Sequence, residues 1–251
     1  MNRITSLTFA SLLVACSSSS NPPTREQYDD TAQAIASTTA SSGGGGDVAS
    51  MSDAVTISLG GMPAGFSLSG NGHFQGSRLG VDYEYAISCK NLAGTVGLCG
   101  AATDQASVDV SWSGNLDTAN VDAAVTRDGH WAITGLQSAT ATFNGDSTFT
   151  FDATLTSIFR PGVTATYSFD ASASYKDILI STQQRQVTGG TATFDLSAHH
   201  QVTGAGANNV DASFDVHAQL TFHADRTADL VLDGSQHYSL NLSSGAVARS
   251  N

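Results

Sequence analysis

Hydrophobic and polar residues alternate one by one along several long segments of this chain. In the clearest segment, the even positions from Val210 to Phe222 are apolar, whereas the odd positions are Asp, Ser, His, Gln or Thr. The same alternation runs through residues 81–89, 107–112 and 163–175. A period of two places successive side chains on opposite faces of a β-strand, so one face is apolar and the other polar. This pattern is typical of antiparallel strands that pack on one side only.

The composition agrees with a β-protein and excludes several other classes. Charged residues make up 13% of the 251 residues, and only two of them are lysines, which is too few for a coiled coil or a charged helical bundle. The formal net charge of -12 has the wrong sign for a nucleic-acid partner. Because 40% of the residues are hydrophobic, the chain can bury a sizeable core and is not expected to be disordered throughout.

Turn signals that contain glycine separate the alternating segments. They lie at residues 128–129, 144–146, 160–162, 189–190, 204–209 and 233–234. Around residues 144–146 the apolar positions are odd on both sides, as Phe143 and Phe149 show, so we expect a three- or five-residue loop with a bulge there. Residues 55–251 are therefore predicted to form one all-β domain. It is an antiparallel meander of about ten to twelve strands with a barrel-like or sandwich shape.

A Phe-Asp-apolar-polar pattern occurs four times in the second half of the chain. It begins at Phe151, Phe169, Phe194 and Phe214, with spacings of 18, 25 and 20 residues. These spacings are too uneven for a solenoid or a propeller. We interpret each occurrence as a strand that directs an aromatic ring inward and a solubilising Asp outward.

The first sixteen residues have the layout of a secretory signal. Arg3 precedes an apolar run of about ten residues, from Ile4 to Val14, which is too short to span a membrane as a helix. The run ends in Leu-Val-Ala-Cys at positions 13–16, and four serines follow. This motif resembles the lipobox of bacterial lipoproteins, and the resemblance covers only residues 1–20.

The lipoprotein resemblance implies that residues 1–15 are a signal peptide that is removed and that Cys16 carries acyl chains. Two or more acyl chains anchor a protein to a membrane essentially permanently. Ser17 stands where an Asp would signal retention in the inner membrane, so the resemblance favours the outer membrane, facing the periplasm or the surface. The expected membrane partner is thus reached through lipid at Cys16.

Residues 16–54 have the composition of a flexible tether, since they are rich in Ser, Thr, Ala and Gly and contain four glycines at 43–46. A helical stretch over residues 25–37 is the one ordered element expected within the tether. Thr24 and Gln27 fit a capping box, and Ala32 and Ile35 fall on one side of such a helix.

Apart from Cys16, the chain has two cysteines, Cys89 and Cys99, which bracket nine residues. In an exported protein, a pair this close is expected to form a disulfide that closes a hairpin or loop. A catalytic thiol is the alternative, but no base lies near either cysteine in the sequence.

The common catalytic motifs are absent from the sequence, which contains no Gly-x-Ser-x-Gly, no His-Glu-x-x-His and no phosphate-binding or dinucleotide-binding glycine pattern. We therefore predict no catalytic residue, no cofactor and no enzymatic activity. Asp195, His199, Asp215 and His217 are weak metal-site candidates, because a hairpin that pairs odd with odd positions places all four on its outer face. The alternative is an exposed polar sheet face.

Three functions remain open at this point. The favoured one is a non-enzymatic binding or structural module of the cell envelope whose partner is a protein or an apolar ligand. The second is a carrier that encloses a lipid or another apolar ligand in a β-barrel, because many inward positions hold alanine. The third is a hydrolase that uses Asp residues. The inward alanines are Ala153, Ala165, Ala171, Ala173, Ala198, Ala212 and Ala218.

Overall fold

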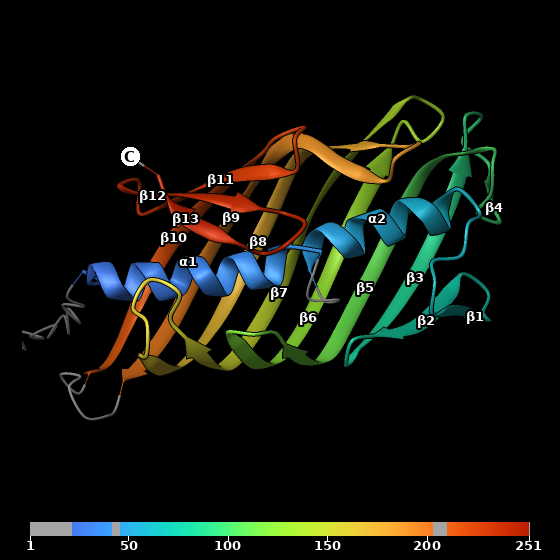
Figure 1. Ribbon diagram of the computed structural model, residues 1–251. Coiled ribbons are helices and arrows are strands. Elements are labelled where there is room, and N and C mark those ends of the chain that lie inside the picture. Colours follow the sequence, from blue (N-terminus) through green and yellow to red (C-terminus); the bar gives the residue numbers. More distant parts are fainter. Residues whose placement is uncertain (1–21, 42–45, 203–209, 251) are drawn as a thin grey trace, which may run out of the picture.

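The computed structural model describes residues 22–41, 46–202 and 210–250. Its main element is one antiparallel β-sheet of thirteen strands, which pair in chain order except that β4 pairs only with β3 (Figure 1). The strands are β1 (Phe66–Gly70), β2 (His73–Arg78), β3 (Val81–Asn91), β4 (Val96–Gly97), β5 (Thr103–Asp117), β6 (Val121–Thr134), β7 (Thr140–Thr156), β8 (Thr164–Ser181), β9 (Gln186–Val202), β10 (Val210–Phe222), β11 (Thr227–Leu232), β12 (Gln236–Asn241) and β13 (Val247–Arg249). The predicted all-β meander is confirmed.

The sheet curls like part of a barrel but is not closed, and β1 and β13 form its two edges. Its apolar positions face the inside of the curve, and its polar positions face outward. The four Phe-Asp patterns follow this rule, since each Phe is buried and each following Asp is exposed. The rings of Phe151 and Phe169 stack across β7 and β8 with their centroids 4.9 Å apart. The interpretation of the Phe-Asp pattern is therefore confirmed.

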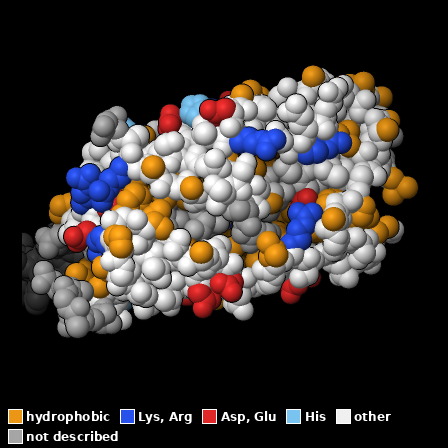
Figure 2. Space-filling model, viewed as in Figure 1, with side chains coloured by type: hydrophobic (Ala, Val, Ile, Leu, Met, Phe, Trp, Pro, Cys, Tyr) orange, Lys and Arg blue, Asp and Glu red, His pale blue; other side chains and the backbone are white. Residues whose placement is uncertain are grey.

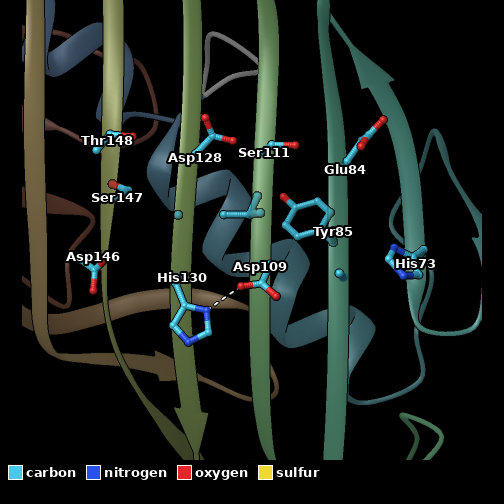
Figure 3. Close-up of a pocket in the computed structure, with 13 residues that line it drawn as sticks. His73, Glu84, Tyr85, Asp109, Ser111, Asp128, His130, Asp146, Ser147 and Thr148 are labelled. Carbon is cyan, nitrogen blue, oxygen red and sulfur yellow. Dashed lines mark hydrogen bonds and ion pairs between the residues drawn. The ribbon is translucent and has the colours of Figure 1, made fainter.

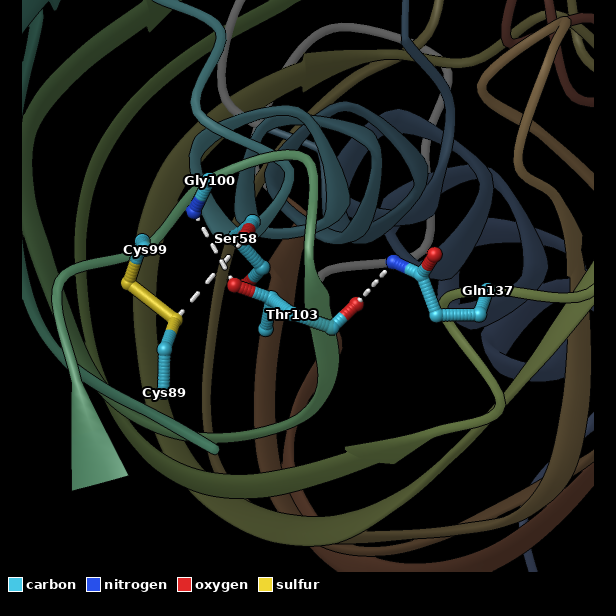
Figure 4. The surroundings of a disulfide bond; sticks show 6 residues. All are labelled: Ser58, Cys89, Cys99, Gly100, Thr103 and Gln137. Carbon is cyan, nitrogen blue, oxygen red and sulfur yellow. Dashed lines mark hydrogen bonds between the residues drawn. A yellow bond between two sulfur atoms is a disulfide. The ribbon is translucent and has the colours of Figure 1, made fainter. Parts of the chain in front are cut away.

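Two helices, α1 (Arg25–Thr39) and α2 (Asp47–Ser58), lie end to end inside the curve of the sheet (Figures 1 and 4). The predicted capping box of α1 is present, because the side chain of Thr24 accepts from the backbone N–H of Gln27 and the Gln27 side chain accepts from that of Thr24. Most residues of both helices are buried. The prediction of a flexible tether over residues 16–54 is thus wrong for residues 22–41 and 46–54.

The tether prediction fails because the polar residues of the helices have partners in the sheet rather than in water. Four aspartates of the helices are buried, and each forms an ion pair with an arginine of the sheet or its loops. The pairs are Asp29–Arg249, Asp30–Arg160, Asp47–Arg127 and Asp53–Arg78. The partners are 25 to 220 residues apart in the chain, so local composition does not reveal them. Asp30 also contacts the buried His200, with 2.9 Å between Oδ2 and Nε2.

The pair between Asp47 and Arg127 is the most deeply buried of the four, since each side chain is only 2% exposed. Arg127 also donates to the hydroxyl oxygen of Ser147 at 2.7 Å. Its guanidinium lies 5.5–5.9 Å from the rings of Trp112, Trp131 and Tyr175, close enough for cation–π attraction. The N-terminus of α2 is therefore held by a charged group that the sheet encloses in aromatic rings.

Three of the predicted turns lie inside strands. Residues 128–129 belong to β6, residues 144–146 to β7 and residues 189–190 to β9, where the register also shifts. The odd parity on both sides of Asn144 arises because β7 continues through these residues without interruption, and the bulge lies opposite them, in β8 between Tyr175 and Ile178. A Cβ atom on Gly129 or Gly145 would lie within 3 Å of Trp131, so these glycines make room for the indole. The turns at 160–162 and 233–234 are confirmed, and 204–209 lies outside the described residues.

We predict that Arg127→Met destabilises the fold strongly. The substitution keeps most of the side-chain volume but leaves Asp47 buried without its counter-charge, which costs about 3–5 kcal/mol of unfolding free energy. Urea denaturation followed by circular dichroism measures this loss.

Two matched variants test the cause of the Arg127→Met effect. Asp109→Asn removes an exposed pair with His130 and is expected to change stability by less than about 1 kcal/mol. The double variant Asp47→Leu/Arg127→Met removes both buried charges and recovers part of the loss. Stability of Arg127→Met within about 1 kcal/mol of the parent protein would contradict the proposed role of the pair.

Candidate apolar binding site

Exposed hydrophobic side chains gather at the end of the molecule that carries β1, β2 and β4. Among the described residues, eight large hydrophobic side chains are exposed, and six of them belong to residues 62–98. These six are Met62, Leu68, Leu79, Leu92, Val96 and Leu98, which are 50–93% exposed, whereas the other two, Ile158 and Leu179, are each 39% exposed. Figure 2 shows hydrophobic side chains at this end, to the right of the view. A concentration of this kind marks a binding surface more often than chance exposure.

Two long stretches of chain at this end contain no acidic residue. Residues 54–81 and 85–103 include none of the 22 Asp and Glu residues of the chain, and their cationic side chains are Arg78 and Lys90. In a chain with a net charge of -12, covering a surface built from these stretches desolvates few charged groups. The exposed leucines therefore lie where an apolar ligand meets no desolvated carboxylate.

A groove of about 510 Å³ lies among these side chains. Ile57 of α2, Phe74 of β2 and Ile87 of β3 line it from the buried side, while Leu68 and Leu98 line it from the exposed side. Much of the remaining lining is glycine, which leaves the groove open between the larger side chains. Its volume is within the range of small-molecule binding sites, about 300–1,000 Å³.

A disulfide holds one border of the groove. Cys89 and Cys99 are bonded as their spacing predicts, with their Cα atoms 5.2 Å apart (Figure 4). Beyond Cys99, the backbone N–H of Gly100 donates to Oγ1 of Thr103 at 2.9 Å, and Gln137 donates to the carbonyl oxygen of Thr103 at 2.6 Å. The loop that carries Leu98 is therefore fixed at both ends rather than free to collapse into the groove.

The register between β9 and β10 determines where the four metal-site candidates lie. β9 and β10 pair odd with odd positions, as expected, so all four side chains are on the outer face. His217 contacts Asp195 with 2.7 Å between Nδ1 and Oδ1, but His199 contacts Asp211 instead, and Asp215 lies opposite a serine. The described residues contain no group of three or more His, Cys, Asp or Glu side chains that converges on one point.

A second hollow lies on the outer face of β2, β3, β5, β6 and β7 (Figure 3). Glu84, Asp109, Asp128 and Asp146 line it together with His130, which contacts Asp109 with 2.6 Å between Nδ1 and Oδ1. Both partners of that contact are at least 65% exposed, so the pair contributes little to stability. We interpret this hollow as part of the solvated polar face.

No protein-family model matches the chain, and no curated protein or solved structure matches it either. Among the residues that the structure describes, no helix has the length and hydrophobicity needed to cross a membrane. The lipobox residues, Cys16 included, lie outside the described residues.

The apolar groove is absent from the sequence-based predictions. Two signals point to it in the sequence: the long stretches without acid, and leucines at positions that break the period of two, such as Leu92 and Leu98. Neither signal shows that α2 closes the groove from below, because the sequence predicts tether for residues 47–54 and β domain for residues 55–58, Ile57 included, whereas the structure makes them one helix.

We predict that Cys89→Ala/Cys99→Ala lowers the unfolding free energy by about 2–3 kcal/mol, the entropic contribution of so short a loop. Urea denaturation with and without reductant measures the change. Reduction should destabilise the parent protein by the same amount and leave the double variant unaffected. Two titratable thiols besides Cys16 in the folded, unreduced protein would contradict the disulfide.

Proposed function

We propose that this protein is a non-enzymatic binding protein of the bacterial cell envelope, anchored through lipid at Cys16, that takes an apolar ligand such as an acyl chain into the groove beside the disulfide. The observation that carries the proposal is that three of the six exposed hydrophobic side chains at this end, Met62, Leu68 and Leu98, line one groove that has no acidic residue in its lining. Covering these side chains gains about 25 cal/mol per Å² of apolar surface, which gives an apolar ligand its binding energy.

The lining of the groove favours binding over catalysis. None of its residues is an acid or a base, and its two polar side chains are Asn71 and Ser88. General acid–base catalysis needs a titratable side chain within hydrogen-bond reach of the reacting atom. The groove offers apolar contact alone, which suits a ligand that is held and released unchanged.

The groove is also pre-organised. The disulfide fixes Leu98, the buried helix α2 supplies Ile57, and the β1–β2 turn is held by a 2.7 Å hydrogen bond from the N–H of Ile87 to the carbonyl oxygen of Gly72. Gly72 has a φ of +76°, and a Cβ there would lie 2.7 Å from the Ile87 oxygen, so only glycine fits this turn. A rigid site loses little conformational entropy when the ligand binds.

The position of the groove relative to the proposed anchor supports a groove that faces away from the membrane. α1 begins nine residues after Cys16, at the opposite end of the molecule from the groove (Figure 1). The two helices between these ends have 15 and 12 residues, which correspond to roughly 40 Å of helix. The anchored end and the ligand-binding end are thus separated by the length of the domain.

Binding of a fluorescent fatty acid tests the proposed ligand class. We expect Leu98→Asp and Leu68→Asp to weaken binding at least about tenfold, since each loses the burial of one leucine, about 1.5–3 kcal/mol, and introduces a charge. Leu179→Asp, at an exposed leucine outside the groove, is the control and should bind like the parent protein. A fluorescence titration in which the parent protein fails to bind, or in which all three variants bind alike, would refute the proposal.

Membrane attachment is tested separately. Cys16→Ser removes the thiol that would carry the lipid, so we expect incorporation of labelled palmitate to fall to background and the protein to leave the washed membrane fraction. The disulfide variant Cys89→Ala/Cys99→Ala should keep both properties. Undiminished palmitate labelling of Cys16→Ser would rule out the lipobox interpretation.

A further inference from the structure

A pocket of about 310 Å³, separate from the apolar groove and from the hollow on the outer face, lies where loops of the sheet approach α2. Arg78 reaches it from β2, Arg185 from the turn between β8 and β9, and Arg226 from the turn between β10 and β11. Asp53 and the other α2 residues that line it come from the first seven residues of that helix. Figure 2 shows Lys and Arg side chains on the face where α2 lies in Figure 1.

The charge of this pocket is opposite to that of the protein as a whole. Its lining contains three arginines and one acid, Asp53, whose two carboxylate oxygens accept from Arg78 at 2.9 and 3.0 Å. No ion pair is found for Arg185 or Arg226 among the described residues, which include all 22 Asp and Glu residues of the chain. The lining therefore has a formal charge of +2 (three cations and one anion) in a chain of net charge -12.

The two unpaired arginines are held at some cost. Arg185 is partly buried, and burial lowers the pKa of its guanidinium. Its side chain donates to the carbonyl oxygen of Thr182, and that of Arg226 donates to Oε1 of Gln186 at 3.2 Å, so neither guanidinium has an anionic partner. Both residues have left-handed backbones, with φ of 56° and 64°, where glycine or asparagine is usual.

The other polar residues in the pocket add donors rather than anions. Gln184 and Ser243 line it and supply neutral side-chain N–H or O–H groups, whereas Ser41 donates its O–H to the carbonyl oxygen of Leu242 at 3.1 Å. A guanidinium carries five N–H donors in a planar fork that matches the oxygens of a phosphate or carboxylate. Because the lining has a charge of +2, a doubly charged anion balances it better than a carboxylate does.

We propose that this pocket is a binding site for a phosphate group, held by Arg185 and Arg226 with Arg78 as the third cation. The site shares no residue with the apolar groove, so it does not depend on the proposed function. The phosphate group belongs either to a small soluble phosphate or to a lipid headgroup, and the two sources share the same chemistry at the arginines.

Calorimetric titration with inorganic phosphate and with pyrophosphate, at low ionic strength, tests the site in the full-length protein. We expect Arg185→Gln and Arg226→Gln each to weaken binding at least about tenfold, in line with a lost charge-assisted hydrogen bond of roughly 1.5–3 kcal/mol. Lys176→Gln removes an exposed cation outside the pocket and serves as the control. The Arg185 substitution leaves the contact from Ser52 to the backbone oxygen of residue 185 in place, so folding should be retained.

A vesicle arm distinguishes the two sources of phosphate. Vesicles of phosphatidylcholine with and without phosphatidic acid are sedimented with protein that lacks the lipid anchor (Cys16→Ser). Titration by soluble phosphate supports a small-molecule site, and arginine-dependent binding to phosphatidic acid alone supports a headgroup site. If neither probe binds, or if Arg185→Gln/Arg226→Gln binds both as well as the parent does, the proposal is overturned. Fatty-acid binding should be unchanged in these variants, which separates this test from that of the groove.

Discussion

The fold depends on carboxylates of two helices meeting guanidiniums of the sheet inside the curve. Four ion pairs are distributed over both helices, so they fix where each helix lies along its own axis and how closely it approaches the sheet. The pairs are Asp29–Arg249, Asp30–Arg160, Asp47–Arg127 and Asp53–Arg78. Buried pairs gain little net stability over apolar residues, because each charge loses its hydration. Their contribution is to specificity: a helix shifted by one turn would leave several buried carboxylates unpaired. Burial raises the pKa of Asp53 to about 6 even though Arg78 lowers it, which shows how strongly desolvation opposes these charges.

The sequence predicts the strands well because the period of two is a local signal. It arises wherever a strand packs on one face only. It predicts the helix at α1 because the capping box of Thr24 and Gln27 is also local. It fails for the burial of both helices, since the partner of Asp29 lies 220 residues away. It also fails at Gly129 and Gly145, where glycine makes room for Trp131 rather than forming a turn. Gly145 lies opposite Trp131 on the neighbouring strand, and Gly129 lies two residues before Trp131 on the same strand. The candidate groove requires the same non-local information, since α2 closes it.

The few cations of the chain are distributed unevenly. Four of its eight arginines hold the helices, and the aspartates that remain are spread over the outer face with histidine, serine and threonine. That face repels polyanions and stays hydrated. Against this background, the two arginines of one pocket that lack carboxylate partners and the six exposed hydrophobic side chains at one end are exceptions to the general pattern. Exceptions that cost stability and are gathered at two separate sites are more readily explained by ligands than by folding.

The buried position of α1 changes what a lipid at Cys16 would do. With a long tether the domain would turn freely above the membrane, but the described chain is already ordered at α1, whose first turns are held by Asp29 with Arg249 and by Tyr28, which donates to Asp233 at 2.8 Å. Nine residues from Cys16 to Arg25 reach at most about 30 Å when extended. The anchor would therefore keep the α1 end of the domain near the membrane surface. Because α2 continues from α1 toward the other end of the sheet (Figure 1), the same helices that complete the core would also direct the apolar groove away from a membrane that held the proposed anchor.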